Sequence, residues 1–231
     1  MSNICIIPAR GGSKRIPRKN IKQFFGKPII SYSIEVAKRS QLFDEIMVST
    51  DDEEIAKIAK ENGAKVPFLR SAERADDFTT TAEVLVEVLD RYKELDKSFK
   101  YVCCLYPAAP LVSFEGLIQG FNKLHTEKRD SVLPVTSFTY PIWRSLRQLS
   151  NGSVELIWPN FQDSRSQDLE KTYHDTGQWY WLNYELFIHN KKLFTKNSGM
   201  IELSQMEVQD IDELTDWKMA ELKYEILQNT R

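Results

Sequence analysis

The stretch from Ile6 to Asn20 reads Ile-Ile-Pro-Ala-Arg-Gly-Gly-Ser-Lys-Arg-Ile-Pro-Arg-Lys-Asn. It begins inside a short apolar run, Ile4 to Ile7, and passes after Pro8 into a loop that holds two glycines and several cations. A short apolar run followed by such a loop is typical of a buried strand that brings a phosphate-binding loop to the edge of a sheet. The stretch therefore predicts a strand over residues 3–9 with an anion-binding loop directly after it.

The cations of this loop have no carboxylate beside them, because the first acidic residue in the chain is Glu35. The cations are Arg10, Lys14, Arg15, Arg18 and Lys19. Guanidinium and ammonium groups can surround a polyphosphate, and Gly11 and Gly12 let backbone N–H groups approach an anion closely. A solvated basic loop is the alternative reading. The position at a strand end, among small residues, favours the anion site.

The length, composition and net charge of the chain are those of an ordinary globular protein. It has 231 residues and a net charge of -2, which suits one domain over residues 1–231 and gives no global electrostatic footprint for nucleic acid. Cys5, Cys103 and Cys104 lie in apolar runs without C-x-x-C spacing, so we expect buried, reduced thiols. No apolar stretch approaches the roughly 18 residues of a membrane span, and the first residues do not resemble a signal peptide. We therefore expect a soluble, cytoplasmic protein with no membrane partner.

Strand patterns alternate with helix patterns over the first 135 residues. The predicted strands cover residues 3–9, 45–50, 65–69, 101–106 and 131–135, and helices are predicted between them. This alternation indicates βαβ units, that is, an α/β fold with a doubly wound, mainly parallel sheet. Ligands bind such sheets outside the carboxyl ends of the strands. The chain is expected to close with strands at 180–184 and 200–203 and a helix at 214–227.

The rhythm breaks over about 137–178, where aromatic and polar residues mix. Asn151-Gly152 is typical of a hairpin turn. A long surface loop is the alternative, but structureless loops beyond roughly 12–15 residues are uncommon. We expect an excursion from the sheet that packs on a partner subunit.

Near the end of the chain, Asp210 and Asp212 bracket Ile211 in a segment without cations. In an extended segment, two such carboxylates project to one side and can share a hard divalent cation together with phosphate oxygens. Asp212 could instead cap the helix that follows. The cationic loop elsewhere in the chain favours a magnesium–polyphosphate site. The chain lacks the G-x-x-x-x-G-K-[ST], G-x-G-x-x-G and G-x-S-x-G motifs, which argues against P-loop ATPases, dinucleotide-binding dehydrogenases and serine hydrolases.

The motif Ala9-Arg10-x-x-Ser13-Lys14-x-Ile16-x-x-Lys19-Asn20 resembles the signature of the CMP-sialic acid synthetases, also called acylneuraminate cytidylyltransferases. The resemblance covers essentially the whole chain and includes Thr50-Asp51 and the segment 208–212. Leu105-Tyr106-Pro107 departs from the Leu-Gln-Pro of the sialic acid enzymes. The segments 143–145, 165–169 and 173–177 look instead like the branch of the family that activates pseudaminic acid.

The resemblance implies a Rossmann-like nucleotidyltransferase fold and a homodimer formed by the excursion. The implied activity joins CTP and a nine-carbon 2-keto sugar acid into a CMP-sugar with release of pyrophosphate, and it requires Mg²⁺. The implied catalytic residues are Arg10, Lys14 and Asp212, and Asp210 and Asp212 would hold the metal. The implied CTP-binding residues are Ala9, Arg10, Gly11, Gly12, Ser13, Lys14, Asn20, Arg70, Thr80 and Thr81. The implied sugar-binding residues are Tyr106, Arg165, Gln167, Tyr173 and His174.

Several of these roles have structural alternatives. Thr80 or Thr81 could cap a helix, Arg70 could pair with Asp76, and His174 could be a structural hydrogen-bonder. Arg144 and Lys171 are further candidates for the carboxylate of the sugar. At the level of function, the alternatives are a synthetase for sialic or legionaminic acid, a non-catalytic nucleotide-sugar binding module, and a glycosyltransferase. A glycosyltransferase would be expected to carry its Asp-x-Asp after a mid-sheet strand.

Overall fold

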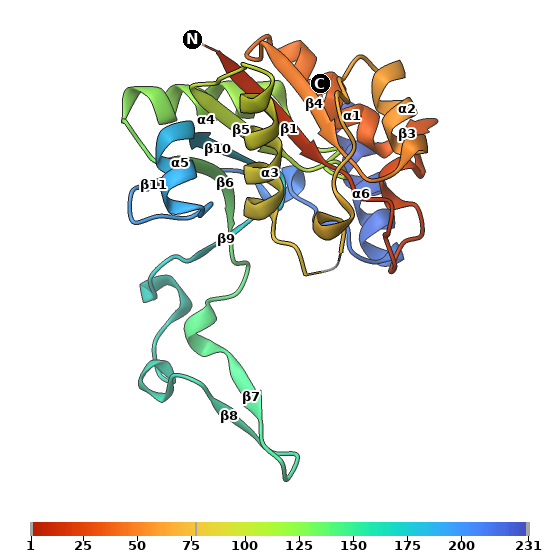
Figure 1. Ribbon diagram of the computed structural model, residues 1–231. Helices are drawn as coiled ribbons and strands as arrows, with labels where there is room; N and C mark the ends of the chain where they lie inside the picture. The colour runs from red at the N-terminus through yellow and green to blue at the C-terminus, as the bar shows by residue number, and fades with distance from the viewer. Residues whose placement is uncertain (1, 77, 230–231) are drawn as a thin grey trace.

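The computed structural model describes residues 2–76 and 78–229 and is built on a central sheet with strand order β11-β6-β10-β5-β1-β4 (Figure 1). β1 pairs in parallel with β4 and β5, and β6 pairs in parallel with β11. β10 lies antiparallel between β5 and β6, and the short strand β9 pairs antiparallel with the end of β6. These strands are β1 Asn3–Pro8, β4 Glu45–Ser49, β5 Tyr101–Leu105, β6 Ser131–Ser137, β9 Tyr173–Asp175, β10 Trp179–Asn183 and β11 Ser198–Glu202. The predicted α/β class with a mainly parallel sheet is confirmed.

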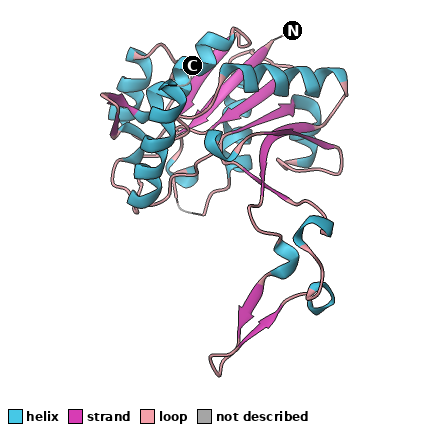
Figure 2. Ribbon diagram, turned by 180° about the vertical axis from the view of Figure 1, so that it is seen from behind, coloured by secondary structure: helices cyan, strands magenta, loops and turns pink. Residues whose placement is uncertain are grey.

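Helices cover both faces of the sheet (Figure 2). Apolar residues of α1 Ile29–Ser40, α2 Glu53–Glu61 and α4 Phe114–Thr126 share one core with one face. Those of α3 Thr81–Glu94 and α5 Tyr184–Asn190 share a second core with the other face. Side-chain caps begin three of these helices: Asp52 accepts from the Ile55 N–H, Thr80 from the Glu83 N–H and Ser113 from the Gly116 N–H. Side-chain caps satisfy N–H groups that have no partner inside the helix, which explains why these helices begin where they do.

The last helix, α6 Leu214–Asn229, packs beside the first loop of the chain. Trp217 and Ala220 of α6 are buried against Phe24, Ile29 and Tyr32. Phe24 belongs to a small hairpin formed by β2 Gln23–Phe24 and β3 Lys27–Pro28. This third apolar cluster places the residues just before α6 next to the glycine-rich loop.

The excursion leaves the body between β6 and β9 and extends well away from it (Figures 1 and 2). Its outer part is a hairpin of β7 Leu146–Gln148 and β8 Val154–Leu156, turned at Asn151-Gly152 with Gly152 at φ 85°. Nearer the body, the ring of Trp143 contacts the rings of Trp158 and Phe161. The predicted excursion and its hairpin are confirmed, and the partner subunit remains a prediction.

One predicted strand does not form. Residues 65–69 make only an isolated bridge, between Lys65 and Met47, and Pro67 has no N–H with which to continue a ladder. The β2–β3 hairpin, α5 and β9 were not predicted. Short 3-10 helices occur at Lys19–Ile21, Ala72–Arg74, Ile142–Arg144, Pro159–Phe161, Ser166–Asp168 and Gln205–Glu207.

Aromatic side chains and the three cysteines fill much of the core, and the predicted burial of the thiols is confirmed. Trp179 and Trp181 are 1% and 0% exposed, and Cys103 and Cys104 belong to the cores on opposite faces of the sheet. All three cysteines are buried, free thiols. Among the helices of the described residues, none combines the length and apolar character that crossing a bilayer requires.

Candidate active site

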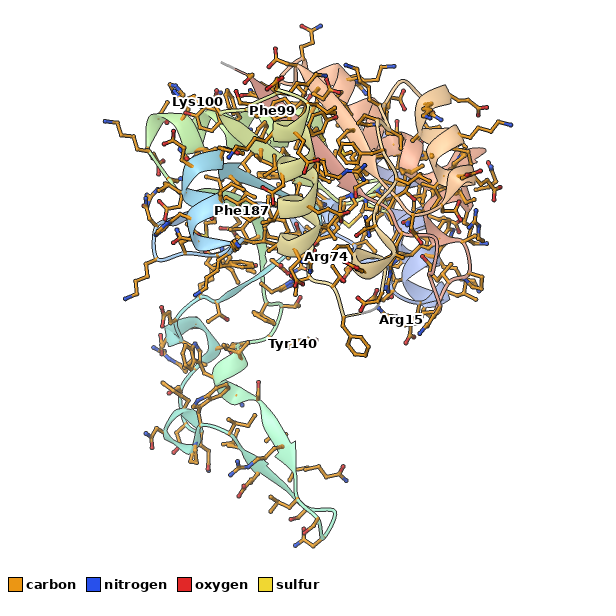
Figure 3. All side chains as sticks on the ribbon, in the orientation of Figure 1. Arg15, Arg74, Phe99, Lys100, Tyr140 and Phe187 are labelled. Carbon is orange, nitrogen blue, oxygen red and sulfur yellow. The ribbon has the colours of Figure 1, made fainter. Side chains whose placement is uncertain are left out.

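A cleft of about 480 Å³ lies at the carboxyl edge of the sheet. Its walls come from the loop after β1, from residues 70–84, from the turn after β5, from the turn between β9 and β10, and from residues 210–212. The cleft thus gathers loops that follow different strands, where an α/β fold is expected to bind its ligand. Figure 3 shows two of its lining side chains, Arg15 and Arg74, at the edge of the body from which the excursion departs.

The two oppositely charged ends of the chain meet in this cleft. Arg15 Nη2 lies 2.7 Å from Asp212 Oδ1. Lys19 Nζ donates to the carbonyl oxygen of Ile211 at 2.6 Å and lies 3.7 Å from Asp212 Oδ1. One ligand placed in the cleft can therefore touch both the cationic loop and the Asp210–Asp212 pair.

The glycine-rich loop is held in place by acidic residues at the start of α2. The Gly11 N–H donates to Asp51 Oδ1 at 2.9 Å, and a Cβ at Gly11 would lie 2.8 Å from Asp52 Oδ2, so a larger residue there would displace the Asp52 side chain. A Cβ at Gly12 would meet nothing within 4 Å, which leaves this position facing open space. Neither glycine is among the residues that line the cleft, although Arg10 and Ser13 on either side of them are.

Arg18 anchors the loop to α2. It is at φ 56° and pairs with both Asp52 and Glu54. The hydrogen bond from Arg18 lowers the pKa of the Asp52 carboxyl, and the hydrogen bond from the Ile55 N–H acts in the same direction. Partial burial raises this pKa, but by less. Arg18 thus differs from Arg10, Lys14, Arg15 and Lys19, which line the cleft.

Of four further nucleotide-binding residues predicted in the loop, three line the cleft and one lies behind it. Arg10, whose Nη1 donates to the Asp76 carbonyl oxygen at 2.9 Å, lines the cleft together with Ser13. Asn20 also lines the cleft; its Nδ2 donates to the Arg10 carbonyl oxygen at 3.0 Å, and its buried Oδ1 has no partner among the described residues. Ala9 is 0% exposed and lies behind the cleft, where its N–H donates to the Ser49 carbonyl oxygen.

Arg70 and Thr81 line the cleft, whereas Thr80 does not. Arg70 is buried, and it donates from Nε to Ser49 Oγ at 3.1 Å and from Nη2 to the Ser49 carbonyl oxygen at 2.6 Å. Burial lowers the pKa of its guanidinium. Thr81 Oγ1 lies 2.8 Å from the hydroxyl of Tyr106, while Thr80 forms a capping box with Glu83. The geometry favours the capping reading for Thr80 and a site role for Thr81.

Of the predicted sugar-binding residues, Tyr106 alone lines the cleft among the described residues. Arg165 is 72% exposed and pairs with Asp168 at 2.7 Å, in the same excursion that carries Gln167. Tyr173 and His174 belong to β9, where His174 Nδ1 lies 2.8 Å from the Asp175 carbonyl oxygen. These four residues lie outside the cleft of their own chain.

The carboxylates at 210 and 212 suit a hard cation. Both line the cleft, on either side of the buried Ile211. Asp210 is exposed, yet desolvation by the cleft walls and then the charge of Asp212 raise the pKa of its carboxyl. The capping role belongs to Asp216, whose Oδ2 accepts from the N–H groups of Asp212 and Glu213 at 3.0 and 2.8 Å. The described residues contain no cluster of three or more metal-ligating side chains, and two carboxylates plus phosphate oxygens are a usual donor set for Mg²⁺.

Several cleft residues were missed by the sequence reasoning. Asp175 and Tyr180 line it from β9 and β10, and Arg74 and Thr79 line it from the segment before α3. Asp175 stands in the motif at 173–177, so a signal for it was present in the sequence. Arg74 and Thr79 lie in irregular backbone, for which periodicity gives no signal.

Comparisons with known proteins agree with this geometry. Residues 4–225 match the model of the family described as cytidylyltransferase. The chain is 40% identical over 226 residues to the pseudaminic acid cytidylyltransferase of Campylobacter jejuni, covering 98% of this chain and 97% of that one. It is 33% identical to the CMP-N,N'-diacetyllegionaminic acid synthase of Legionella pneumophila, covering 99% and 98% of the two chains.

A solved structure shares the fold at low sequence identity. It is a CMP:2-keto-3-deoxy-manno-octonic acid synthetase complexed with CTP, with a TM-score of 0.71 and 16% identity over 99% of this chain and 100% of that one. The likeness supports the fold alone, and the family follows from the sequence matches. The chain belongs to the cytidylyltransferase family.

Proposed function

We propose that the protein transfers a cytidylyl group from CTP to a nine-carbon 2-keto sugar acid, with pseudaminic acid as the preferred acceptor. The products are the CMP-sugar and pyrophosphate. The observation that carries this proposal is the meeting of the cationic loop and the Asp210–Asp212 pair in one cleft. The identity to the pseudaminic acid enzyme of Campylobacter jejuni supports the choice of sugar. With CTP as substrate and three reduced thiols in the core, we place the activity in the cytoplasm.

The reaction is an in-line displacement at the α-phosphorus of CTP. The anomeric oxygen of the sugar acid forms the new bond to phosphorus, the bond to the bridging oxygen of pyrophosphate breaks, and the proton of the hydroxyl passes to solvent water. Arg10 and Lys14 line the cleft and would hold the phosphates as charge develops on them. Gly12 and Ser13 would add hydrogen bonds to the phosphate oxygens. Asn20 would offer its unpartnered Oδ1 to a hydroxyl of the ribose.

Recognition of the cytosine would fall to the opposite wall. Arg70 is buried with part of its guanidinium bonded to Ser49, which fixes its orientation toward the cleft that it lines. Thr81 supplies a hydroxyl on the same wall. A base with both donor and acceptor groups can be matched by a guanidinium and a hydroxyl.

Asp210 and Asp212 would hold a magnesium ion. Bound Mg²⁺ neutralises phosphate charge and lowers the pKa of an attacking hydroxyl. In the structure, Asp212 is paired with Arg15 and has Lys19 nearby, so these two cations compensate its charge when no metal is bound. Since the pair is largely exposed, exchanging Arg15 for a metal ion has a small cost.

The position of Arg165, Gln167, Tyr173 and His174 supports a homodimer. They lie outside the cleft of their own chain, on or beside an excursion that extends away from the body (Figure 1). We propose that the excursion packs on a second copy and supplies Arg165 to the carboxylate of the sugar acid bound there. A C2 dimer would complete both sites by the same contacts.

Pyrophosphate release tests the activity directly. The purified protein would be incubated with CTP, Mg²⁺ and, in separate reactions, pseudaminic, legionaminic, sialic and KDO acids. We expect the highest kcat/KM with pseudaminic acid. A preference for sialic acid would overturn the sugar assignment, and CTP binding without pyrophosphate release from any acid would favour a non-catalytic nucleotide-binding module.

Mixing two inactive variants tests the exchange between subunits. In a mixed dimer of Arg165→Ala and Asp212→Asn, one site keeps its own Asp212 and receives Arg165 from the other chain. Random mixing should therefore restore about a quarter of the wild-type activity, because half of the dimers are mixed and each has one intact site. Activity that stays at the level of the separate variants would contradict exchange through the excursion.

A further inference from the structure

Asp175 places a third carboxylate in the cleft, in addition to Asp210 and Asp212, and after burial and the charge of Asp212 its own charge adds to the raised pKa of Asp210. It is the last residue of β9, and its backbone pairs with Val135 of β6, so its position follows from the sheet. Its side chain is exposed to the cleft. The nucleotide-binding and metal-binding roles proposed above do not include Asp175.

One oxygen of this carboxylate is fixed by a buried tyrosine. The hydroxyl of Tyr180 donates to Asp175 Oδ2. Tyr180 is 4% exposed, and its ring makes edge contacts with Tyr106 at 5.9 Å and with Phe194 at 5.8 Å. Burial and then the bond to Asp175 raise the pKa of Tyr180, so the phenol keeps its proton and remains a donor. Among the described residues, the other oxygen, Oδ1, accepts no hydrogen bond, which makes it a pre-oriented acceptor facing the cleft.

The charge of Asp175 restricts what it can contact. A carboxylate at the position of Asp175, for which no metal role is proposed, repels the carboxylate of a sugar acid. A neutral donor is attracted, and a sugar acid carries such donors in its hydroxyl and acylamino N–H groups. Tyr106, whose ring contacts that of Tyr180, extends this polar surface with its hydroxyl.

We propose that Asp175 binds the sugar acid by accepting a hydrogen bond through Oδ1 from a hydroxyl or acylamino N–H, and that Tyr180 is the residue that positions it. The inference rests on the proposed function and adds a sugar-binding group supplied by the cleft's own chain. It also orients the substrate: the carboxylate of the sugar acid points away from Asp175, and its neutral groups point toward it.

Steady-state kinetics on Asp175→Ala, Asp175→Asn and Tyr180→Phe test the proposal, with Asp90→Asn as the control. Asp90 is an exposed aspartate on α3 outside this cleft. A lost hydrogen bond to a charged group predicts a rise of about 10- to 100-fold in the KM for the sugar acid with Asp175→Ala. The KM for CTP should change less than about two-fold, since no nucleotide contact is removed. Tyr180→Phe keeps the buried ring and should raise the sugar KM in the same direction by a smaller factor.

The outcomes separate this inference from the proposed function. Wild-type turnover together with an unchanged sugar KM in Asp175→Ala overturns the role of Asp175 and leaves the cytidylyltransferase activity standing. A fall in kcat with unchanged KM, together with loss of a limb of the pH–rate profile, would identify Asp175 as a general base and also overturns binding through Oδ1. If the wild-type protein uses no sugar acid at all, both the proposed cytidylyltransferase activity and the role of Asp175 are wrong. If Asp175→Ala does not fold, as judged by thermal unfolding, Asp175→Asn is used with its own expectation. The amide keeps one acceptor oxygen but loses the charge, so the sugar KM should rise by a smaller factor, and an unchanged sugar KM overturns the charged acceptor role of Asp175.

Discussion

Replacement of Asp212 by asparagine should separate catalysis from stability. Asp212 Oδ1 lies 2.7 Å from Arg15 Nη2, but the two side chains are 39% and 63% exposed. Exposed ion pairs contribute about 0.2–1 kcal/mol, so Asp212→Asn should lower the free energy of unfolding by no more than about 1 kcal/mol. For a chain of this size that corresponds to a fall in Tm of about 2–4 °C at most.

The expected effect of this substitution on turnover is far larger. Asp212 is half of the only acidic pair proposed to hold the metal, and removal of one preorganised electrostatic group commonly lowers kcat by about 10²- to 10³-fold. Turnover in a pyrophosphate assay should therefore fall by about 10²- to 10³-fold, while CTP still binds through the cationic loop. CTP binding would be measured by calorimetry and unfolding by urea denaturation on the same preparations.

Asp216→Ala is the matched comparison. Asp216 stands outside the cleft and accepts from the N–H groups of Asp212 and Glu213. Its loss should cost about 1 kcal/mol of stability and leave most of the turnover. If Asp212→Asn kept kcat within a few-fold of wild type, or if the two variants lost activity in proportion to their stability, the metal-binding role of Asp212 would be wrong.

Three further predictions follow from particular contacts. Arg10→Ala should lower kcat by about two to three decades if Arg10 stabilises charge on the transferred phosphate, and single-turnover measurements at saturating CTP would check it. Asp52 has a lowered pKa in the folded state, so its contribution to stability is present at neutral pH and is lost as the pH falls through the folded-state pKa. Between about pH 7 and pH 3, the free energy of unfolding measured in urea should therefore fall more steeply for wild type than for Asp52→Asn. In Gly120→Ala, the new Cβ would lie 2.4 Å from Trp179 Cη2. The variant should lose about 1–3 kcal/mol through overpacking, seen as a lower urea midpoint, and a Tm at or above that of wild type would show that the tryptophan can move aside.

The elements that the sequence predicts well are those whose signals are local. α2, α3 and α4 begin directly after Asp52, Thr80 and Ser113, because each cap is a hydrogen bond to a residue three positions along the chain. The antiparallel insertion of β10 between β5 and β6 has no such signal. It depends on partners about 50 to 75 residues away in the sequence, as the pairs Trp181–Val132 and Trp179–Leu105 show.

The same distinction applies to the site. The excess of positive charge at residues 10–19 and of negative charge at 202–216 can be read from the sequence, and the proposed polyphosphate–metal ligand would use both. The sequence does not show which cations of the loop line the cleft and which hold the backbone in place. Arg18 and Arg10 are both arginines of one loop, but only the contacts with Asp52 and Glu54 show that Arg18 anchors the backbone. Likewise, the motif that contains Arg165 does not reveal that this side chain lies outside the cleft of its own chain.

The site depends on packing that no substrate touches. The residues before α6 reach the cationic loop because Trp217 and Ala220 are buried with Phe24, Ile29 and Tyr32. Phe24 makes edge contacts with the rings of Tyr32 at 5.4 Å and of Trp217 at 5.6 Å, and its β2–β3 hairpin directly follows the glycine-rich loop.

One apolar cluster thus fixes both the end of the cationic loop and the start of the helix that follows the acidic pair. The attraction between Arg15 and Asp212 is too exposed to bring the two ends together by itself, because water screens it. Burial of the aromatic rings supplies the larger free energy, and the ion pair sets only the local alignment of the carboxylate. The opposite charges can therefore remain available to a nucleotide and its metal without being needed to keep the fold closed.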